Sequence, residues 1–108
     1  MKVMKFGGST IKNPKMIKKV GEIIQAEEKE KVVVVSALYG QTNEIREYIT
    51  NVRTEKNEID DFIAKIRSKH NSMALGVIPD KKISMKVMRI LNNHLEKLER
   101  LLYGVAYT

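Results

Sequence analysis

The chain has 108 residues, of which 43% are hydrophobic and 31% are charged, and its formal net charge is +7. This size and composition fit one small domain, or a piece of a larger one, rather than a disordered chain. The sequence has no cysteine, which excludes disulfide frameworks and thiolate metal sites. It has neither a start that resembles a signal peptide nor an apolar run long enough to span a membrane. We therefore expect a cytoplasmic protein.

A short strand is predicted over residues 2–6, and it runs directly into the polar turn Gly7-Gly8-Ser9-Thr10. Two glycines can adopt backbone angles closed to other residues and let N–H groups approach an anion closely. Lys5 adds a point charge, so the segment has the parts of a phosphate site. On these residues alone, a plain tight turn is the better explanation of the glycine pair, and no Walker-type Gly-Lys-Ser/Thr follows.

A helix is predicted next, with Asn13 as its cap, Pro14 in its first position, and apolar residues at helical spacing from Met16 to Ile24. Six lysines and no acidic residue precede Glu22, so an anionic small molecule would be attracted to this end of the chain.

Nucleic acid is the rival partner for such a basic segment. Only 6% of the residues are aromatic and no nucleic-acid motif is present, so we expect no nucleic-acid partner. We interpret Lys12, Lys18 and Lys19 as lysines that keep one helix face in solvent.

A second strand is predicted over residues 32–36, where four consecutive valines indicate a parallel strand buried on both faces. Strand, helix and strand form a right-handed βαβ unit. The loop from Ser36 to Asn43 follows at the strand's carboxyl end, the edge at which Gly7-Gly8 also lies and where ligands collect in parallel sheets. Thr42 suits either a ligand contact or the cap of a helix that carries Ile45, Tyr48, Ile49 and Val52.

The rest of the chain is predicted to be a helical hairpin, with helices over about 57–75 and 81–103. Asn57 is the expected cap of the first helix, and Gly76, Pro79 and Asp80 mark the break between the two. His70 and His94 have no further metal-ligand residues around them, so we interpret both as packing or surface residues and predict no metal site.

Three segments together resemble the amino-terminus of aspartokinases, which belong to the amino acid kinase family. They are residues 5–10 (KFGGST), residues 32–37 (VVVVSA) and the pair Thr42-Asn43, and the hairpin ending at Leu102–Ala106 is also similar. The resemblance implies an α/β fold, the first part of the three-layer amino acid kinase architecture. It also implies that residues 1–108 are the amino-terminal fragment of a catalytic domain, without the remainder of that domain or the regulatory ACT domains.

In aspartokinases, ATP donates its γ-phosphoryl group to the side-chain carboxylate of L-aspartate, which gives 4-phospho-L-aspartate. This reaction is the first step of lysine, threonine and methionine biosynthesis. The resemblance implies ATP, L-aspartate and Mg²⁺ as ligands. It assigns Lys5 to charge neutralisation on the transferring phosphoryl group, and the other roles as follows: phosphate contacts for Gly7, Gly8 and Ser9, and aspartate contacts for Ser36 and Thr42.

Two residues depart from the family pattern. Ser9-Thr10 reverses the commoner Thr-Ser order, and Tyr39 stands where small residues are more usual. We expect the fragment to be inactive alone and to self-associate, for example by swapping helices, or to pair with the missing kinase portion. The alternatives are a basic nucleic-acid-binding module and a partner subunit of a split kinase.

Overall fold

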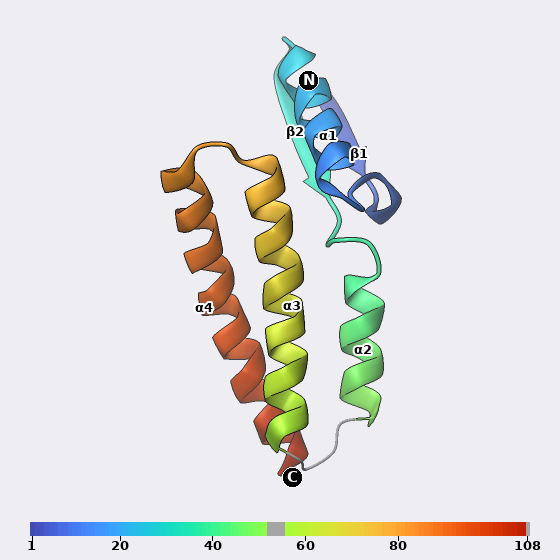
Figure 1. Cartoon of the computed structure of the whole chain (residues 1–108). Coiled ribbons are helices and arrows are strands. Elements are labelled where there is room, and N and C mark those ends of the chain that lie inside the picture. The colour runs from blue at the N-terminus through green and yellow to red at the C-terminus, as the bar shows by residue number, and fades with distance from the viewer. Residues whose placement is uncertain (52–55, 108) are drawn as a thin grey trace. The chain divides into compact units, whose positions relative to one another are not determined.

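The computed structural model describes residues 1–51 and 56–107, apart from the side chains of residues 56 and 57. The elements in chain order are β1 (Lys2–Phe6), the 3-10 turn η1 (Gly8–Thr10), α1 (Pro14–Ala26), β2 (Lys31–Val35), α2 (Gln41–Asn51), α3 (Lys56–Val77) and α4 (Lys81–Ala106) (Figure 1). They form two compact units, Met1–Ile45 and Arg46–Thr108. The chain is α/β, as predicted.

The first unit is built on a parallel pair of strands. β1 pairs with β2 in the register Lys2↔Lys31 to Phe6↔Val35, and α1 connects the two strands. The Ser36 N–H donates to the Phe6 carbonyl at 3.0 Å, so the pairing continues one bond past the end of β2. The predicted strand–helix–strand order with parallel strands is confirmed.

The start of α1 follows from local sequence. The Asn13 side chain accepts a hydrogen bond of 2.9 Å from the Met16 N–H, and Pro14 occupies the first turn, where its missing N–H costs nothing. α1 then buries Val20, which forms the apolar centre of this unit with Met4 and Ile11.

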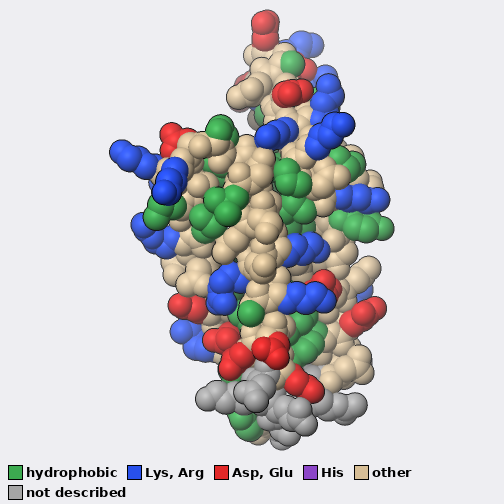
Figure 2. Space-filling view, in the orientation of Figure 1, with side chains coloured by type: hydrophobic (Ala, Val, Ile, Leu, Met, Phe, Trp, Pro, Cys, Tyr) green, Lys and Arg blue, Asp and Glu red, His purple; other side chains and the backbone are tan. Residues whose placement is uncertain are grey.

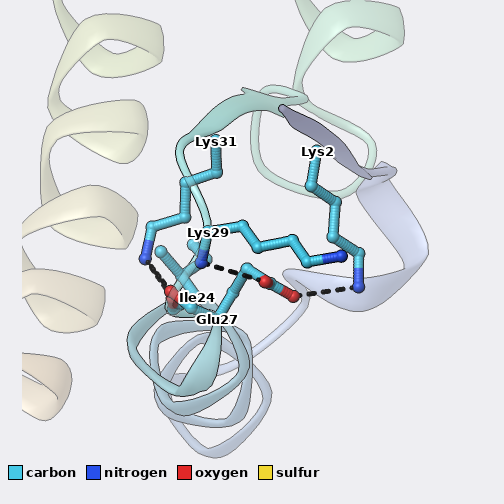
Figure 3. Close-up of polar contacts among 5 residues, drawn as sticks. All are labelled: Lys2, Ile24, Glu27, Lys29 and Lys31. Carbon is cyan, nitrogen blue, oxygen red and sulfur yellow. Dashed lines mark hydrogen bonds and ion pairs between the residues drawn. The ribbon is translucent and has the colours of Figure 1, made fainter.

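The end of α1 is held against the start of both strands by charged side chains (Figure 3). Lys31 Nζ donates to the Ile24 and Glu27 carbonyls at 2.6 and 2.8 Å, and so satisfies two acceptors at the helix carboxyl end. Lys2 Nζ lies 3.0 Å from Glu27 Oε2, and the Lys29 N–H donates to Glu27 Oε1 at 3.2 Å. These bonds lower the pKa of the Glu27 carboxyl, with the Lys2 contact as the main cause.

The expectation that β2 is buried on both faces is wrong for this chain. The side chains of Val32, Val33, Val34 and Val35 are 45, 37, 46 and 59% exposed. Among the described strands β2 pairs only with β1, so the other edge of β2 has no neighbouring strand. One face of this two-stranded sheet is likewise uncovered in the described residues. Figure 2 shows hydrophobic side chains reaching the surface between lysine and arginine side chains.

The second unit contains the predicted helical hairpin, α3 followed by α4, with somewhat longer helices than expected. Asp80 caps α4 by accepting a hydrogen bond of 3.1 Å from the Ile83 N–H. Gly76 lies inside α3, and the break covers residues 78–80. The core is apolar and comes from both helices: Ile59, Phe62, Ile63 and Ile66 from α3, and Leu95 and Leu102 from α4.

Polar and aromatic contacts add to this packing. Arg67 Nε donates to Asn92 Oδ1 at 2.9 Å, which links the two helices. The ring of Tyr48 stacks on that of Phe62, with centroids 3.9 Å apart. Burial is the main cause that raises the pKa of the Tyr48 hydroxyl, and Glu58 and Asp61 add to it.

The apolar residues of α4 lie partly on its buried face and partly on its exposed face. Four of the apolar residues that recur along α4 are exposed, namely Ile83, Val87, Ile90 and Leu101. Thr42 lies in the first turn of α2, because that helix begins at Gln41, so it is not the helix cap. Val52 and the predicted cap side chain of Asn57 lie outside the described residues.

Within residues 1–51 and 56–107, none of the helices combines the length and apolar character that a membrane span requires.

Candidate functional site

The candidate site lies at the carboxyl end of β1, where the strand gives way to the glycine turn. The Thr10 and Ile11 N–H groups donate to the Gly7 and Gly8 carbonyls at 3.0 and 3.1 Å, which closes the turn. The first N–H groups of such a turn have no acceptor within it, so those of Gly8 and Ser9 are available to an anion. Gly7 has φ −79° and ψ 171°, an ordinary extended conformation.

This conformation corrects one sequence-based argument. Gly40 is the one glycine with positive φ, at +77°, in the part of the chain that the structure describes. The glycine pair is therefore not needed for unusual backbone angles. What distinguishes Gly8 is that atoms of another loop lie within 4 Å of its Cβ position.

The second polar loop meets the glycine turn at Gly8. A Cβ atom built at Gly8 would lie 3.5 Å from Ser36 Oγ, 3.7 Å from Tyr39 Cα and 3.9 Å from the Ala37 carbonyl oxygen. Ser36 Oγ donates to that same Ala37 carbonyl at 2.9 Å. The structure thus brings two of the predicted site residues, Gly8 and Ser36, into direct proximity.

Lys5 is the fourth residue of β1, one position before the strand's last residue, and is exposed. Side chains alternate along a strand, so Lys5 shares a face with Val3, which is exposed, and lies opposite Met4, which is buried. Paired residues in a parallel ladder project to the same side, and Lys5 is paired with Val34. In the described residues Lys5 has no ion pair, so its charge is not neutralised by a carboxylate.

Thr42 and Ser9 are placed by their elements. Thr42 is exposed in the first turn of α2, six residues after Ser36, and Ser9 is exposed in the middle of η1. Thr10 has a structural part, because its hydroxyl donates to the Gly7 carbonyl at 2.6 Å.

The structure adds a contact that sequence reasoning missed. Lys12 Nζ lies 4.3 Å from the centroid of the Tyr39 ring, a cation–π distance. The interpretation of Lys12 as a lysine that only keeps a helix face in solvent is therefore wrong. A basic residue just past the glycine turn and an aromatic residue in the opposite loop were the available signals, but no sequence pattern pairs them.

Gln41 is a second residue that sequence reasoning left without a role. It is 4% exposed, and neither atom of its side-chain amide has a hydrogen-bond partner among the described residues. The sequence feature that could have pointed to Gln41 is the preceding glycine, Gly40. Gly40 has a positive φ in the structure and turns the chain immediately before α2. A buried amide without partners is costly, so Gln41 is either a cost to stability or a contact for a ligand.

The histidines agree with their predicted interpretation. His70 is half-buried, with Nδ1 2.9 Å from the Ile66 carbonyl, and His94 is exposed on α4. Within residues 1–51 and 56–107, no group of three histidine or acidic side chains could hold a metal ion.

Comparison with curated proteins returns no match. A family model described as the amino acid kinase family matches residues 1–103, which is nearly the whole chain. The match spans the parallel strand pair, both polar loops and all but the last three residues of the helical hairpin. The chain belongs to the amino acid kinase family, a family of phosphotransferases.

Proposed function

We propose that the chain is the amino-terminal part of an aspartokinase catalytic domain and supplies the phosphate-binding edge of that enzyme. The aspartokinase assignment goes beyond the family match and rests on residues 5–10, residues 32–37 and Thr42-Asn43. The observation that carries the phosphate-binding role is the meeting of Gly8 and Ser36 at the carboxyl edge of a parallel strand pair.

The proposed reaction transfers the γ-phosphoryl group of ATP to L-aspartate. A side-chain carboxylate oxygen of aspartate bonds to the γ-phosphorus, the bond from that phosphorus to the β,γ-bridging oxygen breaks, and ADP leaves with the bonding electrons. Such a transfer needs alignment and charge stabilisation more than covalent chemistry from the protein.

Each proposed residue contributes to that task. Lys5 neutralises charge on the transferring phosphoryl group. The N–H groups of the turn at Gly7, Gly8 and Ser9 contact the phosphates. Ser36 lies beside the phosphate and the acceptor, and Thr42 holds the aspartate. Mg²⁺ would be brought by ATP, bound to its phosphates.

We propose further that catalysis needs the remainder of a kinase domain, supplied by the same or a separate chain. The exposed valines of β2 and the incomplete cover of the two-stranded sheet support this, because parallel sheets normally have both faces covered. The chain alone, incubated with ATP, Mg²⁺ and L-aspartate, is expected to release no ADP. Robust aspartate-dependent release would contradict the requirement for a further part.

Calorimetric titration of the chain with ATP–Mg²⁺, with and without L-aspartate, tests the binding proposal. We expect ATP binding that L-aspartate strengthens and L-glutamate does not. Gly8→Ala should weaken it, because the new methyl group would occupy the space beside Ser36 at ordinary contact distances and leave the fold intact.

Gly21→Ala is the matched control, since Gly21 lies inside α1 and a Cβ there meets nothing within 4 Å. Equal affinity in both variants would contradict ATP binding at the Gly8–Ser36 edge. If the chain does not bind ATP–Mg²⁺, the proposal that this edge binds nucleotide in the isolated chain fails, while the family membership is unaffected.

A further inference from the structure

We propose that Lys12 and Tyr39 form a positioning pair that holds the Gly7–Thr10 turn and the Ser36–Gly40 loop together. We propose also that this pair raises the affinity of the edge between them for a phosphate-bearing ligand. The second part rests on the proposed function, whereas the first stands on geometry alone.

Lys12 is anchored to the glycine turn. It follows Ile11, which is buried and whose N–H donates to the Gly8 carbonyl at 3.1 Å, and it precedes Asn13, the cap of α1. The backbone on both sides of Lys12 is therefore held by hydrogen bonds.

Tyr39 is anchored to the other loop. The Gln41 N–H donates to the Leu38 carbonyl at 2.9 Å, so Tyr39 lies inside a closed turn, and Gly40 follows it with φ +77°. The Tyr39 Cα atom lies 3.7 Å from the Cβ position of Gly8.

The contact between Lys12 Nζ and the Tyr39 ring, at 4.3 Å, thus connects two turns that are each locally closed. Loops already in place do not have to be ordered when a ligand binds, which improves affinity. For an exposed cation–π pair we expect the effect to be about two- to fivefold.

The first measurement is NMR spectroscopy of the full chain without ligand. A cation over an aromatic ring predicts upfield-shifted ε-methylene protons for Lys12. Tyr39→Phe should keep this shift because it retains the ring, and Tyr39→Leu should remove it. Unshifted Lys12 protons in the unaltered chain would overturn the proposal.

Amide exchange then tests whether the pair holds the loops. The amides of Thr10 and Gln41 report on the two turns, because each closes one of them. Lys12→Met and Tyr39→Leu should each speed exchange at both amides about two- to fivefold, and the double variant should be no faster than either single variant.

Lys18→Met is the matched control, since it removes the same charge from an exposed position on α1. If it speeds exchange as much as Lys12→Met does, charge loss alone explains the effect and the positioning role is wrong.

Titration with ATP–Mg²⁺ tests the ligand part. Lys12→Met and Tyr39→Leu should each raise the Kd for ATP–Mg²⁺ about two- to fivefold. Tyr39→Phe, which retains the aromatic ring, should leave the Kd at the value of the unaltered chain. An unchanged Kd in both variants would overturn the effect on affinity. If the unaltered chain binds no ATP–Mg²⁺, the ligand part fails together with the nucleotide proposal, and the exchange data alone decide whether the pair holds the loops.

Discussion

Neighbouring hydroxyl residues in the glycine turn have different tasks. The Thr10 hydroxyl donates to the Gly7 carbonyl within the turn, while Ser9 is exposed at its centre. A side chain that closes its own turn stabilises the geometry that presents the preceding N–H groups. The Ser-Thr order therefore gives the structural task to the second hydroxyl, that of Thr10, and leaves the first exposed.

Gln41 provides a prediction about stability. Its buried amide has no hydrogen-bond partner in the described residues, so Gln41→Met should raise the free energy of unfolding by about 1–3 kcal/mol. Denaturant unfolding followed at amides of α2 would measure it. Destabilisation accompanied by weaker ATP–Mg²⁺ or L-aspartate binding would contradict this and assign the amide to the ligand. Gln25→Met, at an exposed position on α1, is the control.

Tyr103 provides a prediction about pH. Its hydroxyl donates to Asp60 across the hairpin, and this bond is the main cause that raises the pKa of Tyr103 to about 12. Since the folded pKa is above the usual value near 10, the contribution to stability is complete below pH 10 and is lost as pH rises toward 12.

Asp60→Ala should lower the ionisation midpoint of Tyr103 from about 12 toward the usual value near 10, as followed by NMR of the ring carbon that bears the hydroxyl. Asp61→Ala removes the neighbouring carboxylate on the same helix and should leave the midpoint near 12. Equal midpoints in the two variants would show that the Asp60 bond does not set the pKa.

At the scale of elements, α1 is delimited by side chains that replace missing backbone bonds. Asn13 satisfies an N–H at its start, and Lys31 satisfies two carbonyls at its end. The start is encoded within a few residues of sequence. The end depends on a residue of the following strand, so the helix and β2 stabilise each other.

Lys31→Met tests this dependence. It removes two charge-assisted hydrogen bonds and should destabilise the first unit by about 1–3 kcal/mol, because the Glu27 carbonyl loses its Lys31 donor and the Ile24 carbonyl keeps only the Glu27 N–H at 3.3 Å. Amide exchange across α1 and β2 is the measurement. Lys29→Met should have little effect, since Lys29 contacts Glu27 through its backbone N–H, which the substitution keeps. Equal effects would contradict the capping role.

At the scale of the whole molecule, exposed apolar surface indicates association. Val3, Val32 and Val34 project from the same face of the sheet, by strand alternation and register, and all three are exposed. Such a surface and an unpaired strand edge are typical of interaction sites.

We predict that the chain self-associates through this face. Sedimentation velocity should show a mass that increases with concentration, and the double variant Val32→Thr, Val34→Thr should shift the transition to higher concentration. Ile49→Thr, which removes a similarly exposed apolar side chain from α2, is the control. A monomeric mass across a broad concentration range would contradict the prediction.

Sequence patterns predicted most of the fold because the signals are local. Periodic apolar residues, a proline and capping side chains specify where helices begin, and a run of valines specifies a strand. The same patterns could not predict which apolar residues of α4 face the hairpin. Ile83 and Leu95 look alike in sequence, and only the position of α3 leaves the first exposed and buries the second.

The sequence by itself determined the order of elements, the polar loops at the carboxyl ends of both strands, and the family resemblance that the match over residues 1–103 supports. Only the tertiary structure decided that Gly8 lies against Ser36, that Lys12 lies over Tyr39, and that β2 stays exposed. The physical reason is the separation of the contacting residues along the chain. Turns and caps depend on neighbours in the chain. A contact between residues 27 or 28 positions apart exists only once strand pairing has brought the two loops to one edge.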